Sequence, residues 1–262
     1  MHPDTQPWAF ETITGQKGVP IDDVGTPAAP PKPSRGRACA IAAGALWISA
    51  GGAYFVLEAI AAARFRPYYS YAHDYISDLG VTTPGMLHGR TVDSPLAYLM
   101  NTAFYVQGSF FLLGALLVAC AVRPTRAGPL VGFAAMNAVG NIAVGTIHSG
   151  PAAEVAGIAW LHGAGAVAAI AGGNLAILAG SAAVRKTGAA QWYCAVSIGL
   201  AAVGLLSFTM LAIDVKTAAG GPPLLGVWER GGVYSIIAWQ MLTGGHLICR
   251  LPAGQMREPV NP

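Results

Sequence analysis

Long apolar runs dominate the chain between residues 38 and 250, and short polar segments separate them. A helix needs about 20 apolar residues to cross the hydrocarbon core of a bilayer. Six runs reach about that length, and they cover residues 38–63, 96–122, 129–148, 156–184, 191–213 and 231–249. The pattern predicts an all-α integral membrane bundle of six transmembrane helices, because helices satisfy their own backbone groups in lipid.

Composition excludes an ordinary soluble domain. Hydrophobic residues make up 54% of the chain and charged residues 10%, whereas soluble domains carry about 25% charge. The net charge of +3 is not gathered into a basic patch, so we expect a lipid bilayer and no nucleic acid as partner. The cysteines lie in or beside the apolar runs without a paired spacing, which does not suggest a disulfide framework.

The two ends of the chain predict its orientation. Residues 1–37 are polar and rich in Pro and Gly, which predicts a disordered tail, and residues 251–262 form a second short tail. Ten of the 15 Lys and Arg residues fall on the side of the termini. The positive-inside rule therefore places both tails in the cytoplasm.

Polar residues collect at the opposite, external end of the predicted bundle. The loop of residues 64–95 contains the aromatic string YYSYAHDYISDLG, and we expect it to be ordered and to cap the bundle. Ionisable residues near a bilayer are functional candidates by default, although helix ends also reach water at little cost. The external group consists of His73, Asp74, Ser77, Asp78, His148, His162, Asp214, Glu229 and Arg230.

These residue types suggest roles in a polar pocket. Asp78 and Glu229 are candidate catalytic acids or bases, with His162 as their partner. We expect substrate contacts from Ser77, His148, Asp214 and Arg230.

Arg230 has two interpretations. Its guanidinium suits a phosphate or carboxylate headgroup. A structural ion pair is the alternative, in which Glu229 or Arg230 pairs with Asp78 or Asp214.

Metal binding is a weaker possibility. His148 and His162 are the candidate ligands, with a nearby acid. No HExxH or similarly dense spacing supports them, so the cofactor stays unknown.

Other polar and small residues lie deeper. Asn137 and Asn141 share one face of their helix and predict interhelical hydrogen bonds. Gly165, Ala169 and Gly173 repeat every four residues, which predicts close helix packing. Glu58 is either a buried acid or a carboxylate that reaches the headgroups.

Three strings together resemble a known family. HDYISDLG, HGAGAVAAIAGGNLAILAG and GVWERGGVYSIIAWQMLTG are similar to the bacterial six-helix membrane family called domain of unknown function 998, over about residues 40–250. The resemblance matches Ser77, Asp78, His162, Glu229 and Arg230 to recurrent positions of that family. It implies a bacterial plasma membrane and, through a distant similarity to the Frag/DRAM/Sfk group, a lipid-related role. It implies no reaction.

The leading hypothesis is a membrane protein that handles a lipid or isoprenoid at an external polar pocket. Alternatives are a metal-dependent hydrolase and an isoprenoid cyclase with Glu58 or Asp214 as proton donor. A non-enzymatic transporter or assembly partner is the third alternative, and Asn137, Asn141 and Asn174 would then line a path. The sequence leaves open the ligand, the oligomeric state and whether the protein is an enzyme.

Overall fold

The computed structural model describes residues 35–87, 89–121, 124–185, 190–217 and 224–249. Long helices make up most of this part of the chain: α1 (Arg35–Ala62), α2 (Ala97–Ala121), α3 (Pro124–Thr146), α5 (Ala159–Arg185), α6 (Gln191–Thr217) and α7 (Leu225–Cys249). Shorter elements occur in the connections: the 3₁₀ helix η1 (Ile76–Gly80), the antiparallel strands β1 (Gly85–Leu87) and β2 (Arg90–Val92), and α4 (Pro151–Val155).

Five helices are long and apolar enough to cross a membrane, namely α1, α2, α3, α5 and α6. The prediction of a multi-helix membrane protein is therefore confirmed in its general form. The sixth predicted span corresponds to α7, which has 25 residues but does not meet the same criterion. Its first turns contain Glu229 and Arg230, which lower its mean hydropathy.

The helices α1 and α7 begin at other residues than predicted. Helix α7 begins at Leu225 rather than at residue 231, because Glu229 and Arg230 bond to other parts of the bundle. Residues 35–37, assigned to the tail, are the first residues of α1. The remainder of the predicted tails, 1–34 and 250–262, lies outside the described residues.

The connection before α5 also differs from the prediction. The run beginning at residue 156 was expected to be one helix, but α4 ends at Val155 and α5 begins at Ala159. Gly157 lies between them with φ +70°. This left-handed conformation is easy for glycine and ends a helix. The break turns the chain at the end of the bundle where the loop lies.

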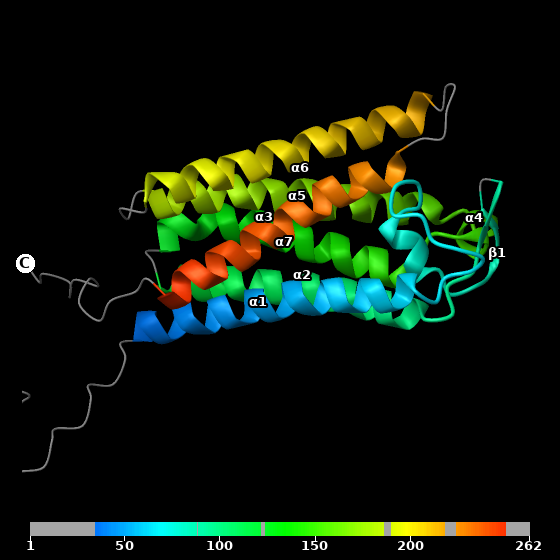
Figure 1. The fold of residues 1–262 in the computed structure, drawn as a ribbon. Helices are drawn as coiled ribbons and strands as arrows, with labels where there is room; N and C mark the ends of the chain where they lie inside the picture. Colours follow the sequence, from blue (N-terminus) through cyan, green and yellow to red (C-terminus); the bar gives the residue numbers. More distant parts are fainter. Residues whose placement is uncertain (1–34, 88, 122–123, 186–189, 218–223, 250–262) are drawn as a thin grey trace, which may run out of the picture. The chain divides into compact units, whose positions relative to one another are not determined.

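Figure 1 shows the long helices side by side, with the start of α1 and the end of α7 at the same end of the bundle. The other end carries η1, the β1–β2 hairpin and α4. Helix α3 packs against α2 and α5, and α7 packs against α1 and α6. The aromatic loop is ordered, as expected, and η1 contacts α1, α2 and α7.

An aromatic cluster fills the core of the bundle about midway along α1, α2 and α7. The rings of Trp47 and Trp239 lie 5.4 Å apart, and Phe111 contacts both. Trp47 donates its indole N–H to the Phe111 carbonyl at 3.1 Å, and Trp239 donates to Ser197 Oγ at 3.2 Å. Both indoles are therefore buried with their only polar group satisfied.

Small residues bring α3 and α5 into close contact, as the Gly165, Ala169 and Gly173 spacing predicts. A Cβ atom on Gly140 would lie 2.5 Å from the Gly165 carbonyl oxygen and 2.7 Å from Ala169 Cα. Asn137 donates to the Ala169 carbonyl at 2.6 Å, which confirms the predicted interhelical bond. Asn141 donates within α3, to Asn137.

Gly140→Ala is expected to destabilise the protein by about 1–3 kcal/mol, because the new methyl group overpacks the α3–α5 contact. Gly132 lies on the same helix, and a Cβ atom there would have nothing within 4 Å. Gly132→Ala is expected to be neutral or to stabilise the helix by up to about 1 kcal/mol. Thermal unfolding of both variants in detergent tests this contrast. Equal melting temperatures would contradict the proposed tight contact.

Candidate functional site

A cavity of about 410 Å³ lies between α5 and α6, at the end of the bundle that carries the loop. We call it the lateral cavity. Four of the seven predicted site residues line it: Ser77, Asp78, His162 and Glu229. They come from the loop, α5 and α7 and are far apart in the sequence. The structure thus brings together the three residues proposed as acid, base and partner.

The walls of the lateral cavity divide into a polar end and an apolar part. The polar groups lie near η1 and the first turns of α5 and α7. The apolar side chains come from α5 and α6: Val167, Ile170, Phe208, Leu211, Ala212 and Val215. Val167 is 49% exposed and Val215 is 57% exposed, so the apolar wall continues onto the outer surface of these helices.

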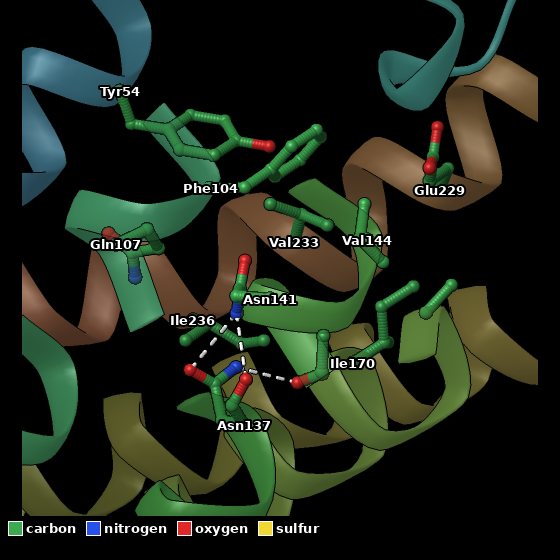
Figure 2. Close-up of a pocket in the computed structure, with 12 residues that line it drawn as sticks. Tyr54, Phe104, Gln107, Asn137, Asn141, Val144, Ile170, Glu229, Val233 and Ile236 are labelled. Atoms are coloured by element: carbon green, nitrogen blue, oxygen red, sulfur yellow. Dashed lines mark hydrogen bonds between the residues drawn. The ribbon is translucent and has the colours of Figure 1, made fainter. Parts of the chain in front are cut away.

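Glu229 connects α7 to the loop. Its Oε2 accepts a hydrogen bond from the backbone N–H of Ile76, the first residue of η1. The side chain is buried, and Figure 2 shows it apart from the other labelled polar residues, near the loop segment. A carboxyl group at this position can bond a ligand and at the same time hold η1 in place.

Asp78 is held by one arginine and one backbone amide. Its Oδ2 accepts from Arg90 Nη2 at 2.7 Å and from the Tyr75 N–H at 2.9 Å. Arg90 Nη1 also donates to Asp74 Oδ1 at 2.6 Å, so one guanidinium bridges two carboxylates. Burial raises the pKa of the Asp78 carboxyl, and the charge of Arg90 opposes this rise.

The second carboxyl oxygen of Asp78 has no hydrogen-bond partner among the described residues, although it is buried. A buried acceptor without a partner is unfavourable by about 1–3 kcal/mol. Because Asp78 lines the lateral cavity, this oxygen is suited to accept a hydrogen bond from a ligand there.

His162 has one ring nitrogen that can accept a hydrogen bond or a proton from a ligand. Its Nδ1 lies 2.7 Å from the Ile147 carbonyl oxygen, which can only accept, so Nδ1 carries the proton. In the neutral ring Nε2 is then the acceptor. His162 is 8% exposed and lines the lateral cavity, as its predicted inward position required.

Three predicted substrate contacts lie elsewhere among the described residues. His148 bonds Thr82 Oγ1 at 3.3 Å and the Gly145 carbonyl at 3.0 Å, and it lines an adjoining cavity of about 200 Å³, which shares Ser149 and Gly150 with the lateral cavity. Asp214 accepts from Trp228 Nε1 at 2.9 Å, between α6 and α7. Arg230 is the third and does not line the lateral cavity either.

The expected pairing of Arg230 with Asp78 or Asp214 is wrong. Arg230 Nη2 pairs with Glu58 Oε1 of α1 at 3.0 Å, and Tyr234 donates to both oxygens of Glu58. Glu58 is 1% exposed, which fits the buried-acid interpretation and not the headgroup one. Glu58 lies 172 residues upstream of Arg230, and the sequence contains no signal that pairs them.

Arg230 also fixes the aromatic loop. Its Nη1 donates to the backbone carbonyls of Tyr71 at 2.8 Å and Asp74 at 3.1 Å, and its Nη2 donates to the Tyr69 hydroxyl. The guanidinium lies 4.6 Å from the centre of the Tyr71 ring, within cation–π range. These contacts occupy both terminal nitrogens of the guanidinium, and the remaining donor, Nε, is buried without a partner among the described residues. Arg230 is therefore a structural anchor in this fold.

Metal ligation is not favoured by the arrangement of side chains. His148 and His162 line different cavities. In the described part of the chain, no three side chains of His, Cys, Asp or Glu are close enough to hold a metal ion.

Sequence reasoning missed four polar residues that line the lateral cavity: Tyr75, Ser149, Glu154 and Lys216. Burial, with the charges of Glu229 and Asp78, raises the pKa of Tyr75 to about 12, so its hydroxyl stays protonated at neutral pH. The aromatic string around Tyr75 was a sequence signal that could have identified Tyr75 as a site residue. Lys216 is a single charge at a helix end, and no sequence signal identifies it.

Arg230→Gln and Glu58→Gln are each expected to destabilise the protein by about 3–5 kcal/mol, because each leaves a buried charge without its partner. The double variant should lose at least about 1 kcal/mol less than the sum, since it removes both charges. Thermal unfolding in detergent measures this cycle. Arg66→Gln is the control, because Arg66 is 70% exposed in its 3.9 Å pair with Asp93, and such pairs contribute about 0.2–1 kcal/mol. Additive losses for Glu58 and Arg230 would contradict the anchor.

Comparison with curated proteins and with solved structures gave no significant match. Comparison with protein families gave one, to the family described as "protein of unknown function (DUF998)", over residues 35–246. The match spans α1 to most of α7 and includes every residue of the lateral cavity. This agrees with the resemblance drawn from the loop, α5 and α7 strings, and the chain belongs to the DUF998 family.

Proposed function

We propose that this protein binds an amphiphile, a lipid or an isoprenoid lipid, in the lateral cavity. One observation carries the proposal: Asp78, His162 and Glu229 line a cavity that also has a large apolar wall, formed mainly by side chains of α5 and α6. A polar headgroup would contact these residues, and an apolar tail would lie along α5 and α6. Ligand pockets commonly combine apolar walls with a few convergent polar groups.

The proposal includes six membrane crossings. Helix α7 lies along the same bundle as the five apolar helices and packs against α1 and α6. Its two charged residues, Glu229 and Arg230, bond inside the protein and so need not face lipid. With the Lys and Arg distribution, this topology puts both termini in the cytoplasm and the lateral cavity at the external headgroup level of a bacterial plasma membrane.

The buried groups favour a headgroup that donates hydrogen bonds. Asp78 Oδ1 has no hydrogen-bond partner among the described residues. His162 carries its proton on Nδ1, which leaves Nε2 as an acceptor. Arg230, which would attract a phosphate, is occupied by Glu58 and the loop. Lys216 is at an exposed position. We therefore assign a hydroxyl- or amine-bearing headgroup rather than a phosphate.

The same residues suit proton transfer. Asp78 or Glu229 can accept a proton from a bound hydroxyl, and His162 can assist through Nε2. Turnover of the ligand would place Asp78, His162 and Glu229 in catalytic roles, whereas binding alone would make the protein a lipid carrier or sensor.

Gly163→Leu is expected to lower amphiphile binding about tenfold, which corresponds to 1.4 kcal/mol. Gly163 lines the lateral cavity, and a Cβ atom there would have nothing within 4 Å, so the new side chain fills cavity space without a clash. Native mass spectrometry of the protein released from nanodiscs measures the bound lipid. Gly199→Leu is the matched control, because Gly199 is an equally open position on α6 outside the cavity lining. Equal lipid occupancy in the two variants would contradict the proposal.

Headgroup selectivity tests the chemical class. Nanodiscs containing a diacylglycerol and the phosphatidic acid with the same acyl chains offer ligands that differ by a phosphate alone. We expect the wild-type protein to retain the diacylglycerol, because its hydroxyl can donate to Asp78. Asp78→Asn should remove this preference, since the amide replaces an acceptor by a donor. Preferential retention of phosphatidic acid by the wild-type protein would overturn the assignment.

A further inference from the structure

A third cavity lies deeper in the bundle, between α1, α2, α3, α5 and α7. We call it the interior cavity. Its volume is about 30 Å³, and its polar lining consists of Tyr54, Gln107, Asn137, Asn141 and Glu229. Figure 2 shows these side chains around it, together with Phe104, Val144, Ile170, Val233 and Ile236.

Two polar atoms in the interior cavity are buried without a partner among the described residues. They are the Tyr54 hydroxyl and Gln107 Oε1. Tyr54 is 1% exposed and Gln107 is 3% exposed, so bulk solvent does not reach them. Gln107 Nε2 donates to Gln240 Oε1 at 2.6 Å, which leaves the oxygen as the unused end of the amide.

The orientation of Asn141 supports a shared ligand. Its Nδ2 donates to the Asn137 carbonyl at 3.0 Å, so its oxygen is turned away from that bond. Figure 2 shows the Tyr54 hydroxyl and the Asn141 side chain pointing toward the same space. A donor and acceptors thus converge on one small volume.

Glu229 belongs to both cavities. Together with Ala166 and Ile170 it lines the interior cavity and the lateral cavity. Its carboxyl group is directed at the loop, where Oε2 accepts from the Ile76 N–H. The charged groups nearest to it in the fold are Asp78 of η1, Glu58 of α1 and its neighbour Arg230.

We infer that the interior cavity is a water-binding site, held by Tyr54, Gln107 and Asn141. A buried water needs about 10–15 Å³ and two to four polar partners, and this cavity provides both. Water bound here gives a partner to the Tyr54 hydroxyl and to Gln107 Oε1, which have none among the described residues. The inference does not depend on amphiphile binding in the lateral cavity.

X-ray hydroxyl-radical footprinting of the full chain in nanodiscs tests the site, because buried residues are oxidised when they adjoin bound water. Tyr193 is the matched control: it is 0% exposed, and its hydroxyl bonds Thr243 Oγ1 at 2.8 Å inside the protein. We expect Tyr54 to be oxidised several-fold faster than Tyr193. Equal, background-level oxidation of the two would overturn the inference.

Tyr54→Phe gives a second test, in which the direction of the change in melting temperature decides the outcome. If the hydroxyl bonds water, its removal loses a hydrogen bond and the melting temperature falls, as it should for Tyr193→Phe. If the hydroxyl is dry and unpaired, its removal relieves an unfavourable burial and the melting temperature rises. A fall supports the inference, and a rise overturns it. Neither result bears on lipid retention, so the failure of this inference is distinguishable from that of the proposed function.

Discussion

The buried ion pair between Arg230 and Glu58 is the constraint on which the loop end of this bundle depends. It joins the first and the last long helix, and the same guanidinium holds the backbone of the aromatic loop at Tyr71 and Asp74. Replacing water around two charges is unfavourable unless further hydrogen bonds complete their shells. Here Tyr234 and Tyr69 supply those bonds, so the pair can be buried where an isolated charge could not.

Because the anchor fixes the loop, it also positions the site without belonging to it. Arg230 holds the carbonyls of Tyr71 and Asp74, and Glu229 holds the amide of Ile76, two residues before Asp78. Arg90 adds a third connection from β2 to Asp74 and Asp78. Asp78 therefore reaches the lateral cavity on a segment restrained from three directions. Such restraint keeps a polar group in place for a ligand.

The sequence was sufficient for the general architecture and for four of the residues that line the lateral cavity, and the reasons are visible in particular residues. Apolar runs of about 20 residues specify helices in lipid, and the convergence of Asp78, His162 and Glu229 follows from antiparallel helices that deliver their ends to one side. Gly165 and Ala169 indicated close packing because small residues have few other reasons to repeat every four positions.

Pairings between distant residues could not be predicted in the same way. Glu58 and Arg230 are 172 positions apart, and any of several acids was a possible partner. His148 and Asp214 lie at the expected depth, yet they turn toward Thr82 and Trp228. Depth follows from hydropathy, but the direction of a side chain around its helix depends on neighbours that a single sequence does not identify.

The contacts of Arg230 with Glu58 and the loop also imply an order in which the helices assemble during synthesis. On the six-crossing topology, α7 is the last of these helices to leave the ribosome, and among the described long helices it is the one that falls short of the apolarity of a membrane span. Its charged first turns have no partner in the chain until Glu58 and the loop are already in place. Insertion of α7 is then a docking step onto an assembled surface rather than simple partitioning into lipid. A nascent chain stopped before Leu225 would leave Glu58 without its cation and without the helix that covers it, so an unfinished molecule differs from a complete one by an uncovered acid on α1.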